Sequence, residues 1–498
     1  MEFFRAIFFA DVAAGWKARA PGRRNFTAAP VVPARLLNMV ASMDPRSLQF
    51  VAKACAGEQL TGSPETLARR VCTNSKDVRP GDVFFALTGE KHDGHQFLKE
   101  VLGKDAAAAV VLRQRLPLNF DGALIAVEDT REALARLAAE YRRDFTLPVI
   151  AVGGSNGKTT TKELIASVLR QKLSTLWSEA SFNNNIGVPL TLLRLESHHE
   201  AAVLEVGTNH PGEIAPLVAM IQPRFGVITS IGREHLEFFG DVNGVAEEEG
   251  WLAELLPTDG KLFINGDTSF AEAVAARSKA AVARVGFSSG SHWRIGNLRT
   301  DETGVEFDLA APLEDFSGEY RVNLLGRHQA TNAALAIAIG AELGLSAEEI
   351  RRGLVSCQPP KMRLQVSERN GVKILNDAYN ANADSMLAAL TTLNEFPCRG
   401  QRIAVLGDMA ELGAHAAAAH DEVGRKTAAL GVNRLVTVGK MAGVIAQAAR
   451  AAGLRDVTEC RDVGEAAAVL KNSTHAGDVI LLKASRVTGL EKLSESLG

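Results

Sequence analysis

Hydrophobic positions along the chain fall into two alternating patterns. Short apolar runs rich in β-branched residues predict strands, and longer stretches rich in Ala and Leu predict helices. Leu147–Val152 is an apolar run, and after a glycine-rich turn Leu164, Ile165, Val168 and Leu169 recur on one helix face. The other predicted strands are Ala201–Val206, Phe225–Ile231, Lys261–Asn265, Arg402–Leu406, Arg434–Val438 and Val479–Leu482. This alternation predicts an α/β fold with parallel sheets and helices on their faces.

Two breaks in the pattern divide the chain. Phe145–Pro148 leads into the strand before the glycine-rich turn, and Gln358-Pro359-Pro360 is a stiff spacer. At roughly 150 residues per domain, a length of 498 residues also suits three domains. We therefore predict domains over 43–147, 148–357 and 358–498. Residues 1–42 are basic and lack regular hydrophobic spacing, so we expect a loose extension or a start codon placed too early, with Met43 opening the folded part.

Composition narrows the classes of function. The 55 Lys and Arg residues against 58 Asp and Glu residues leave a net charge of −3, which argues against nucleic-acid binding. No apolar run approaches the roughly 18 residues of a membrane span, so no membrane partner is expected. The five cysteines are widely spaced without a C-x-x-C pair. They favour reduced thiols in a cytoplasmic protein over a disulfide framework or a zinc site.

The glycine-rich turn has the position of a phosphate-binding loop, because it lies between a predicted strand and a predicted helix. Backbone N–H groups in such a turn, and the helix dipole behind it, surround phosphate oxygens. Lys158 is then expected to reach the β- and γ-phosphates of ATP, and the Thr159 hydroxyl to bind Mg²⁺. The expected nucleotide-binding residues here are Gly154, Ser155, Asn156, Gly157, Lys158, Thr159 and Thr160. Val152 replaces the usual first glycine, and the alternative is a glycine-rich turn with a solvated lysine.

Two residues after other predicted strands are candidate metal ligands. Glu205 ends the strand that begins at Ala201, and His235 follows the strand that begins at Phe225. A carboxylate near the metal is a general requirement of phosphate-loop enzymes, and a neutral imidazole also binds divalent ions. Each residue alone would more often be structural. Their position after a phosphate loop favours a magnesium site.

With these motifs the chain resembles the Mur ligases, the cytoplasmic enzymes of peptidoglycan precursor synthesis. Gly154–Thr160 resembles their ATP loop, and Ser181–Leu190 resembles their N-N-x-I-G-x-P segment. Glu205–Ile214 resembles E-x-G-x-N-x-x-G-E-I. Leu325–Ala333 resembles G-x-H-N-x-x-N-A, with Gln329 in place of the usual Asn. The resemblance extends over nearly all of residues 44–498.

Segments in the outer two domains refine the resemblance. Asn376–Met386 resembles D-A-Y-N-A-N-P-D-S-M, and Leu406–Gly413 resembles L-G-D-M-x-E-L-G. Both are similar to the family member that adds D-alanyl-D-alanine to a UDP-N-acetylmuramoyl-tripeptide. Thr73–Lys76 stands where the family has T-D-[ST]-R, and Gly81–Leu87 matches G-D-x-F-x-A-L. The resemblance implies an N-terminal α/β domain that binds the UDP substrate, a central parallel-sheet ATPase domain and a C-terminal Rossmann-like domain.

The resemblance also implies the chemistry and the residues that perform it. It implies an ATP-dependent amide ligase that works through an acyl phosphate, with ATP and Mg²⁺ as cofactors. The catalytic residues implied are Lys158, His235 and Arg363. The further nucleotide contacts implied are Asn332 to adenine, Asp377 to ribose, and Arg363. The magnesium ligands implied are Thr159, Glu205 and His235. The substrate-binding residues implied are Ser75, Asn183, Asn184, Tyr379, Asn380 and Asn382.

One position departs from the family. Most Mur ligases carry a lysine that CO₂ carbamylates, and the added carboxylate helps to hold a second magnesium ion. Gly244–Gly250 reads G-V-A-E-E-E-G where relatives have G-V-A-K-A-K-G, so Glu249 stands at the modified lysine. A glutamate supplies a carboxylate without modification, and hard cations prefer oxygen ligands. The alternative is a solvated acidic run near a helix start, favoured there by the helix dipole.

Other functions remain open at this point. A folylpolyglutamate-like or other amino-acid ligase would share the phosphate loop, and a regulator that binds ATP without making a bond is a second alternative. The motif Asn376–Met386 and the UDP-like N-terminal domain favour the Mur reaction. We expect a cytoplasmic monomer whose partners are its small-molecule substrates.

Overall fold

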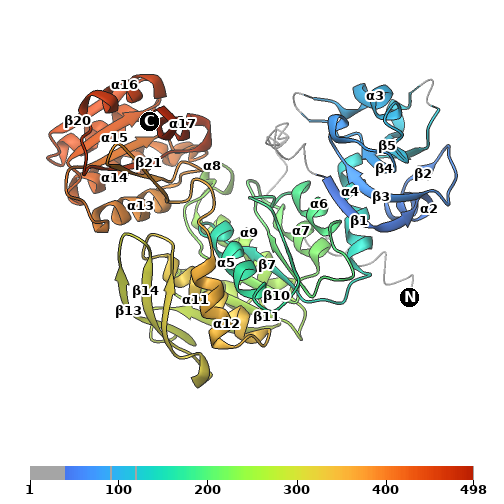
Figure 1. The fold of residues 1–498 in the computed structure, drawn as a ribbon, viewed down its shortest axis with the longest axis horizontal. Coiled ribbons are helices and arrows are strands. Elements are labelled where there is room, and N and C mark those ends of the chain that lie inside the picture. The colour runs from blue at the N-terminus through green and yellow to red at the C-terminus, as the bar shows by residue number, and fades with distance from the viewer. Residues whose placement is uncertain (1–39, 90–91, 118–120, 497–498) are drawn as a thin grey trace. The chain divides into compact units, whose positions relative to one another are not determined.

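The computed structural model describes residues 40–89, 92–117 and 121–496. Its chain divides into two compact units, one of residues up to 151 together with 176–223, and one of residues 152–175 and 224–498. Three β-sheets with interspersed helices confirm the predicted α/β class (Figure 1). Most of the predicted extension lies outside the described residues.

The N-terminal domain is built on a six-stranded sheet of order β1-β3-β4-β5-β6-β2. Its four inner strands are parallel, and the two edge strands are antiparallel to their neighbours. The strands are β1 (Val40–Ser47), β2 (Glu58–Gln59), β3 (Leu67–Cys72), β4 (Asp82–Phe85), β5 (Ala108–Leu112) and β6 (Leu124–Val127). The helices are α2 (Leu48–Ala54), α3 (Leu98–Leu102) and α4 (Thr130–Arg142).

The folded part begins earlier than the sequence suggested. Val40 pairs with Cys72 in the β1–β3 ladder, and Ala41 is fully buried. The sheet therefore includes residues before Met43, the expected starting point. The hydrophobic spacing missed them because three residues are too few to show an alternation.

The remainder of the first unit carries the first three residues of the strand that leads to the phosphate loop. In β7 (Val149–Gly153) every residue is buried, as expected for a strand covered on both faces. The backbone carbonyl of Pro148, just before β7, accepts a 3.1 Å hydrogen bond from the Ala202 N–H in β9 (Ala201–Glu205). This unit also contains β8 (Thr175–Trp177), α6 (Gly187–Leu192) and α7 (Ile214–Ile221).

The second unit begins with Val152 and places the helix of the phosphate loop, α5 (Lys158–Leu169), against α11 (Gln329–Glu342) and α12 (Ala347–Ser356). Residues 329–340 of α11 are all buried, since apolar side chains surround this helix. Its strands are β10 (Phe225–Ile228), β11 (Lys261–Asn265), β12 (Ala281–Gly286), β13 (Trp293–Thr300), β14 (Val305–Ala310) and β15 (Gly318–Val322). The helices after β10 and β11 are α8 (Leu236–Phe239), α9 (Val242–Glu254) and α10 (Ala271–Ala275).

These strands are not all parallel, in contrast to the prediction. β10 to β13 are parallel, whereas β13, β14 and β15 form an antiparallel meander. Buried and more exposed residues alternate along β14, which is typical of an antiparallel strand with one exposed face. The sequence pattern did not reveal the meander because charged residues interrupt its apolar positions.

The C-terminal sheet has the order β16-β17-β21-β18-β19-β20, parallel except for the edge strand β16. Helices α16 and α17 cover the face formed by Ile374, Val405, Val436 and Leu482 (Figure 1). The strands are β16 (Gln365–Arg369), β17 (Val372–Asn376), β18 (Arg402–Gly407), β19 (Arg434–Val438), β20 (Asp456–Cys460) and β21 (Val479–Lys483). The helices are α13 (Ala383–Glu395), α14 (Ala416–Ala429), α15 (Ala442–Ala451), α16 (Val463–Ser473) and α17 (Glu491–Ser496). This doubly covered, mostly parallel sheet has the predicted Rossmann-like architecture.

No helix in the described part of the chain has the length and apolar character needed to cross a membrane.

Candidate functional site

The turn between β7 and α5 depends on two glycines. Gly154 has φ +113°, and a Cβ added to it would lie 2.5 Å from Thr229 Oγ1. Gly157 has φ +87°, and its Cβ would lie 2.8 Å from Asn332 Oδ1. Only glycine adopts these backbone angles in so little space. The predicted adenine contact, Asn332, is therefore packed directly against the phosphate loop and is itself buried.

The loop after β10 holds this turn in place. Ser155 N–H donates to Ser230 O at 2.8 Å, and Asn156 N–H donates to Ser230 Oγ at 2.9 Å. The Thr229 hydroxyl donates to Asn156 O at 2.6 Å. The turn is thus preorganised beside the N-terminus of α5, where the helix dipole favours an anion.

The Lys158 side chain lies within the turn and faces a buried carboxylate. Its Nζ donates to the carbonyl of Gly154 and, at 3.3 Å, to that of Ser155. The same ammonium lies 3.4 Å from Glu234 Oε2, and the two side chains are only 13% and 7% exposed. Glu234 was not predicted as a site residue, although it directly precedes His235.

Glu249 lies beneath the loop and not in solvent. It is fully buried in α9, and its Oε2 accepts a 2.7 Å hydrogen bond from Gly154 N–H. Burial raises the pKa of Glu249 to about 8, with Lys158 acting to lower it and Glu234 to raise it. By contrast, Glu247 is exposed and contacts Arg277. Of these two glutamates, only Glu249 contacts the phosphate loop.

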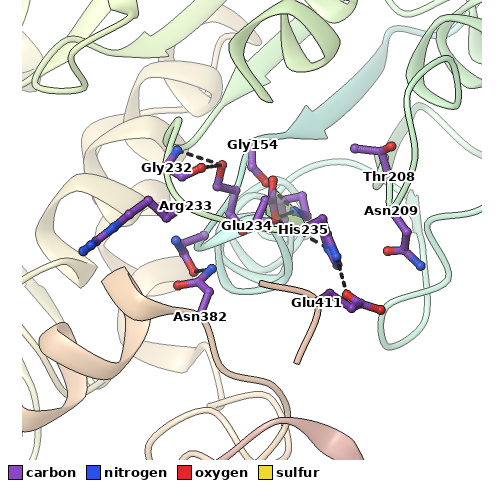
Figure 2. A network of polar contacts seen from close by, with 12 residues as sticks. Gly154, Thr208, Asn209, Gly232, Arg233, Glu234, His235, Asn382 and Glu411 are labelled. Atoms are coloured by element: carbon purple, nitrogen blue, oxygen red, sulfur yellow. Dashed lines mark hydrogen bonds and ion pairs between the residues drawn. The ribbon is translucent and has the colours of Figure 1, made fainter. Parts of the chain in front are cut away.

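His235 lies beside Glu234, and a side chain of the C-terminal domain contacts its ring. Its Nδ1 makes a hydrogen bond with Glu411 Oε2, and its Nε2 faces Glu234 Oε2 at 4.0 Å (Figure 2). His235 has φ +48°, in the left-handed region, at the start of α8. Glu411 was not among the predicted site residues, although it lies within the motif Leu406–Gly413.

Arg233 forms a second connection between the central and C-terminal domains. Its guanidinium donates to Asp384 Oδ1 at 2.6 and 2.8 Å and to Glu422 Oε2 at 2.5 Å. Its backbone N–H donates to Asp384 Oδ2 at 2.8 Å. Asn382 Nδ2 donates to Asn156 Oδ1 at 3.0 Å, which brings this predicted substrate residue to the phosphate loop. No sequence pattern indicated Arg233 as an anchor.

The predicted nucleotide residues of the C-terminal domain form their own cluster. Asp377 Oδ2 pairs with Lys483 Nζ at 2.6 Å, and Asp377 Oδ1 accepts from Leu364 N–H at 3.1 Å. Burial lowers the pKa of Lys483, although the Asp377 carboxylate opposes this shift. Arg363 stacks on the ring of Tyr379, with Cζ 4.2 Å from the ring centroid. Lys483 was not predicted.

Asn380, another predicted substrate residue, is exposed, and its carbonyl accepts from Lys483 Nζ at 3.2 Å. Thr160, predicted from the phosphate-loop motif, is buried in the first turn of α5. Thr159, beside it, is also buried.

The remaining predicted residues lie in the first unit. Asn183 Nδ2 donates to Glu205 Oε1 at 2.9 Å, so these two predicted residues are in contact. Asn184 Oδ1 accepts from the N–H groups of Ile186 and Gly187, and so caps the start of α6. Ser75 is buried and donates to Glu100 at 3.3 Å.

The donor chemistry of these clusters suits a divalent cation. Among the described residues, no group of three or more His, Cys, Asp or Glu side chains is already arranged as a metal site. However, Glu234 Oε1 and Glu249 Oε1 in the second unit, and Glu205 Oε2 in the first, are buried without a hydrogen-bond partner in the described structure. Buried carboxylate oxygens are costly unless they pair or bind a cation. Each of these carboxylates, taken within its own unit, therefore suits a divalent cation.

Comparison with known proteins identifies the family. The family models for the Mur ligase catalytic domain, the Mur ligase middle domain and the Mur ligase glutamate ligase domain match residues 68–142, 152–340 and 362–486. The chain is 36% identical to the UDP-N-acetylmuramoyl-tripeptide–D-alanyl-D-alanine ligase of Escherichia coli, over 78% of this chain and 85% of that protein. The chain belongs to the Mur ligase family, in its MurF branch.

Solved MurF structures have the same fold. The structure of MurF from Acinetobacter baumannii matches with a TM-score of 0.84 and 31% identity, over 92% of this chain and 99% of that one. MurF from Thermotoga maritima, solved in complex with ADP, matches with a TM-score of 0.76 and 28% identity, over 86% of this chain and 96% of that one. The resemblance seen in the sequence motifs is confirmed.

Proposed function

We propose that this chain is an ATP-dependent amide ligase that joins D-alanyl-D-alanine to UDP-N-acetylmuramoyl-tripeptide in cytoplasmic peptidoglycan precursor synthesis. The observation that carries the proposal is the phosphate loop, in which Lys158 lies 3.4 Å from the buried Glu234 carboxylate and Gly154 N–H binds Glu249. The E. coli and A. baumannii relatives bear the name of this ligase or of MurF, and the T. maritima relative was solved with ADP.

The reaction needs no enzyme nucleophile. The terminal carboxylate of the tripeptide attacks the γ-phosphorus of ATP, so that ADP leaves and an acyl phosphate forms. The amine of D-alanyl-D-alanine then attacks the acyl carbon, loses a proton and displaces phosphate. Both steps bring anions together, so the protein must mainly position them and neutralise their charge.

The residues of the phosphate loop supply that neutralisation. The Lys158 ammonium faces the β- and γ-phosphates, and the N–H groups at the start of α5 bind phosphate oxygens. We propose that Thr159, Glu205, His235 and Glu249 hold magnesium. When bound, Mg²⁺ neutralises phosphate charge during transfer. With its phosphate partner in place, Lys158 exchanges its carbonyl contacts for phosphate oxygens.

Other residues are proposed to bind the nucleotide and the two substrates that are joined. Asn332 contacts adenine, Asp377 contacts ribose, and Arg363 reaches the nucleotide. The residues proposed for the UDP-muramoyl-peptide and the dipeptide are Ser75, Asn183, Asn184, Tyr379, Asn380 and Asn382. The Asn184 side-chain oxygen already accepts from two N–H groups at the start of α6, so this helix holds the residue in place.

We further propose that Glu249 takes the place of the carbamylated lysine of its relatives. Its burial beneath the loop and its partnerless Oε1 support this assignment. The alternative was an acidic run favoured by the dipole at a helix start. It does not apply, because α9 begins at Val242 and Glu249 lies in its second half. The glutamate side chain reaches the loop, since its Oε2 accepts the hydrogen bond from Gly154 N–H.

The domain boundaries, the cytoplasmic location and the monomeric state stay predictions. A folylpolyglutamate-like ligase or an ATP-binding regulator is less well supported, because curated relatives above 30% identity carry the D-alanyl-D-alanine ligase name.

Phosphate release tests the proposal. The purified protein is incubated with ATP and UDP-N-acetylmuramoyl-tripeptide, with and without D-alanyl-D-alanine. We expect sustained phosphate release only with both substrates. Phosphate release that does not depend on either substrate would instead identify an ATP-hydrolysing regulator. Phosphate release with a folate substrate would identify a folylpolyglutamate-like ligase.

A further inference from the structure

Glu411 contacts His235 through its side chain and contacts α8 through its backbone carbonyl. The Glu411 Oε2 makes a hydrogen bond with His235 Nδ1 (Figure 2). The Glu411 carbonyl accepts a 3.0 Å hydrogen bond from Glu237 N–H in α8. Glu411 itself has φ +60°. A strained backbone that places one side chain against one ring is a feature of functional sites.

The segment around Glu411 is fitted to α8 along its length. A Cβ added to Gly413 would lie 3.1 Å from the Glu237 Cα, and His415 Nε2 bonds the carbonyl of Gly240 at 2.8 Å. The C-terminal domain therefore contacts both ends of α8, and the contact with His235 is one of several. This arrangement allows the role of Glu411 to be separated from that of docking in general.

The contact has a chemical consequence for the imidazole. An ionised carboxylate only accepts hydrogen bonds, so Nδ1 must carry the proton. In the neutral ring Nε2 then has a free lone pair. Nε2 faces Glu234 Oε2 at 4.0 Å, beyond hydrogen-bonding distance, on the side of Lys158. A carboxylate behind a metal-binding histidine commonly fixes its tautomer and orientation.

We propose that Glu411 is a positioning residue, supplied by the C-terminal domain, that fixes His235 with Nδ1 protonated and presents Nε2 as a ligand for the divalent cation. The proposal rests on the proposed ligase function, in which His235 holds magnesium. It makes the cation site dependent on docking of the C-terminal domain, because His235 is correctly oriented only when Glu411 is in place.

The test begins with the metal-free full-length protein. The ¹⁵N chemical shifts of the His235 ring report which nitrogen carries the proton. We expect protonated Nδ1 in the wild type and in Glu411→Gln, whose amide oxygen still accepts. Glu411→Ala should shift His235 towards the Nε2-protonated form. A wild-type ring protonated at Nε2 alone would overturn the proposal without any variant.

The second readout is Mn²⁺ binding in the presence of saturating ADP, followed by electron paramagnetic resonance. Glu411→Ala should weaken Mn²⁺ binding about 10- to 100-fold, and Glu411→Gln should lose much less. His415→Ala is the matched control, because it removes a docking contact to α8 and leaves His235 and Glu411 untouched. An equal loss in His415→Ala, or unchanged binding in Glu411→Ala, would overturn the proposal. Neither result would affect amide synthesis by the wild type, which tests the proposed function separately.

Discussion

The backbone N–H of Gly154, in the phosphate loop, donates a 2.7 Å hydrogen bond to Oε2 of the fully buried Glu249. On our proposal, the Glu249 side chain supplies the carboxylate that the family resemblance assigns to a carbamylated lysine. A residue that departs from the family pattern is thus hydrogen-bonded to the candidate phosphate loop.

Glu249→Gln should therefore raise the magnesium requirement and lower turnover, on the order of tenfold or more. The amide keeps the shape but not the charge of the carboxylate. Glu247→Gln is the matched control and should change little, because Glu247 is exposed and contacts Arg277. Steady-state rates across a magnesium titration measure both variants, and equal tolerance of the two substitutions would contradict the assignment.

Removal of dissolved bicarbonate should leave the wild-type rate unchanged. The carboxylate of Glu249 needs no CO₂ to form, unlike a carbamylated lysine. Assays in degassed buffer with and without added bicarbonate measure this. A rate that rises with bicarbonate would show that another group is carbamylated.

The raised pKa of Glu249 predicts a pH-dependent stability of the metal-free protein. Because the folded-state pKa of Glu249 is about 8 and the ordinary pKa of a glutamate is 4.5, the folded state binds the proton more tightly. The contribution of Glu249 to the free energy of unfolding is thus fully present below about pH 4.5. It falls as the pH rises towards 8, by up to about 1.4 kcal/mol per pH unit. Glu249→Gln should flatten this contribution. Thermal unfolding from pH 5 to 8 compares the two proteins, and identical slopes would contradict the burial argument.

Lys158→Ala should lower kcat by about 10²–10³-fold, because it removes a preorganised charge that faces the transferred phosphate. The fold should persist, since the Lys158 side chain makes polar contacts within a loop. Circular dichroism checks the fold while single-turnover kinetics measure the rate. A folded variant with nearly normal turnover would show that the phosphate-loop assignment is wrong.

The sequence predicted the local parts of this site better than the distant ones. The order of strand, glycine turn and helix around Lys158 is a local pattern, and it predicted the phosphate loop. Glu411 and Arg233 were missed because their partners are 176 and 151 residues away in sequence. Only the packing of the C-terminal domain against the loop after β10 brings these residues together. Glu234 was missed for another reason. It is a charged residue that is buried beside Lys158, and the spacing of apolar residues does not reveal such a position.

Arg233→Ala should loosen this docking, because four hydrogen bonds of the guanidinium to Asp384 and Glu422 are lost. These groups are partly exposed, so we expect a local cost of about 1–2 kcal/mol. Hydrogen exchange should rise in residues 230–240 and in the first turn of α13. Arg461→Ala, at an arginine side chain that is 91% exposed, is the control and should leave these regions unchanged.

The central claim is that phosphate is transferred to the substrate carboxylate before the amide forms, and isotope transfer tests it most directly. UDP-N-acetylmuramoyl-tripeptide with both terminal carboxylate oxygens labelled with ¹⁸O is converted with ATP and D-alanyl-D-alanine, and the products are weighed by mass spectrometry. The acyl-phosphate route predicts one ¹⁸O in the released phosphate and one in the new amide carbonyl. Unlabelled phosphate, or labelled substrate recovered without an amide product, would contradict it.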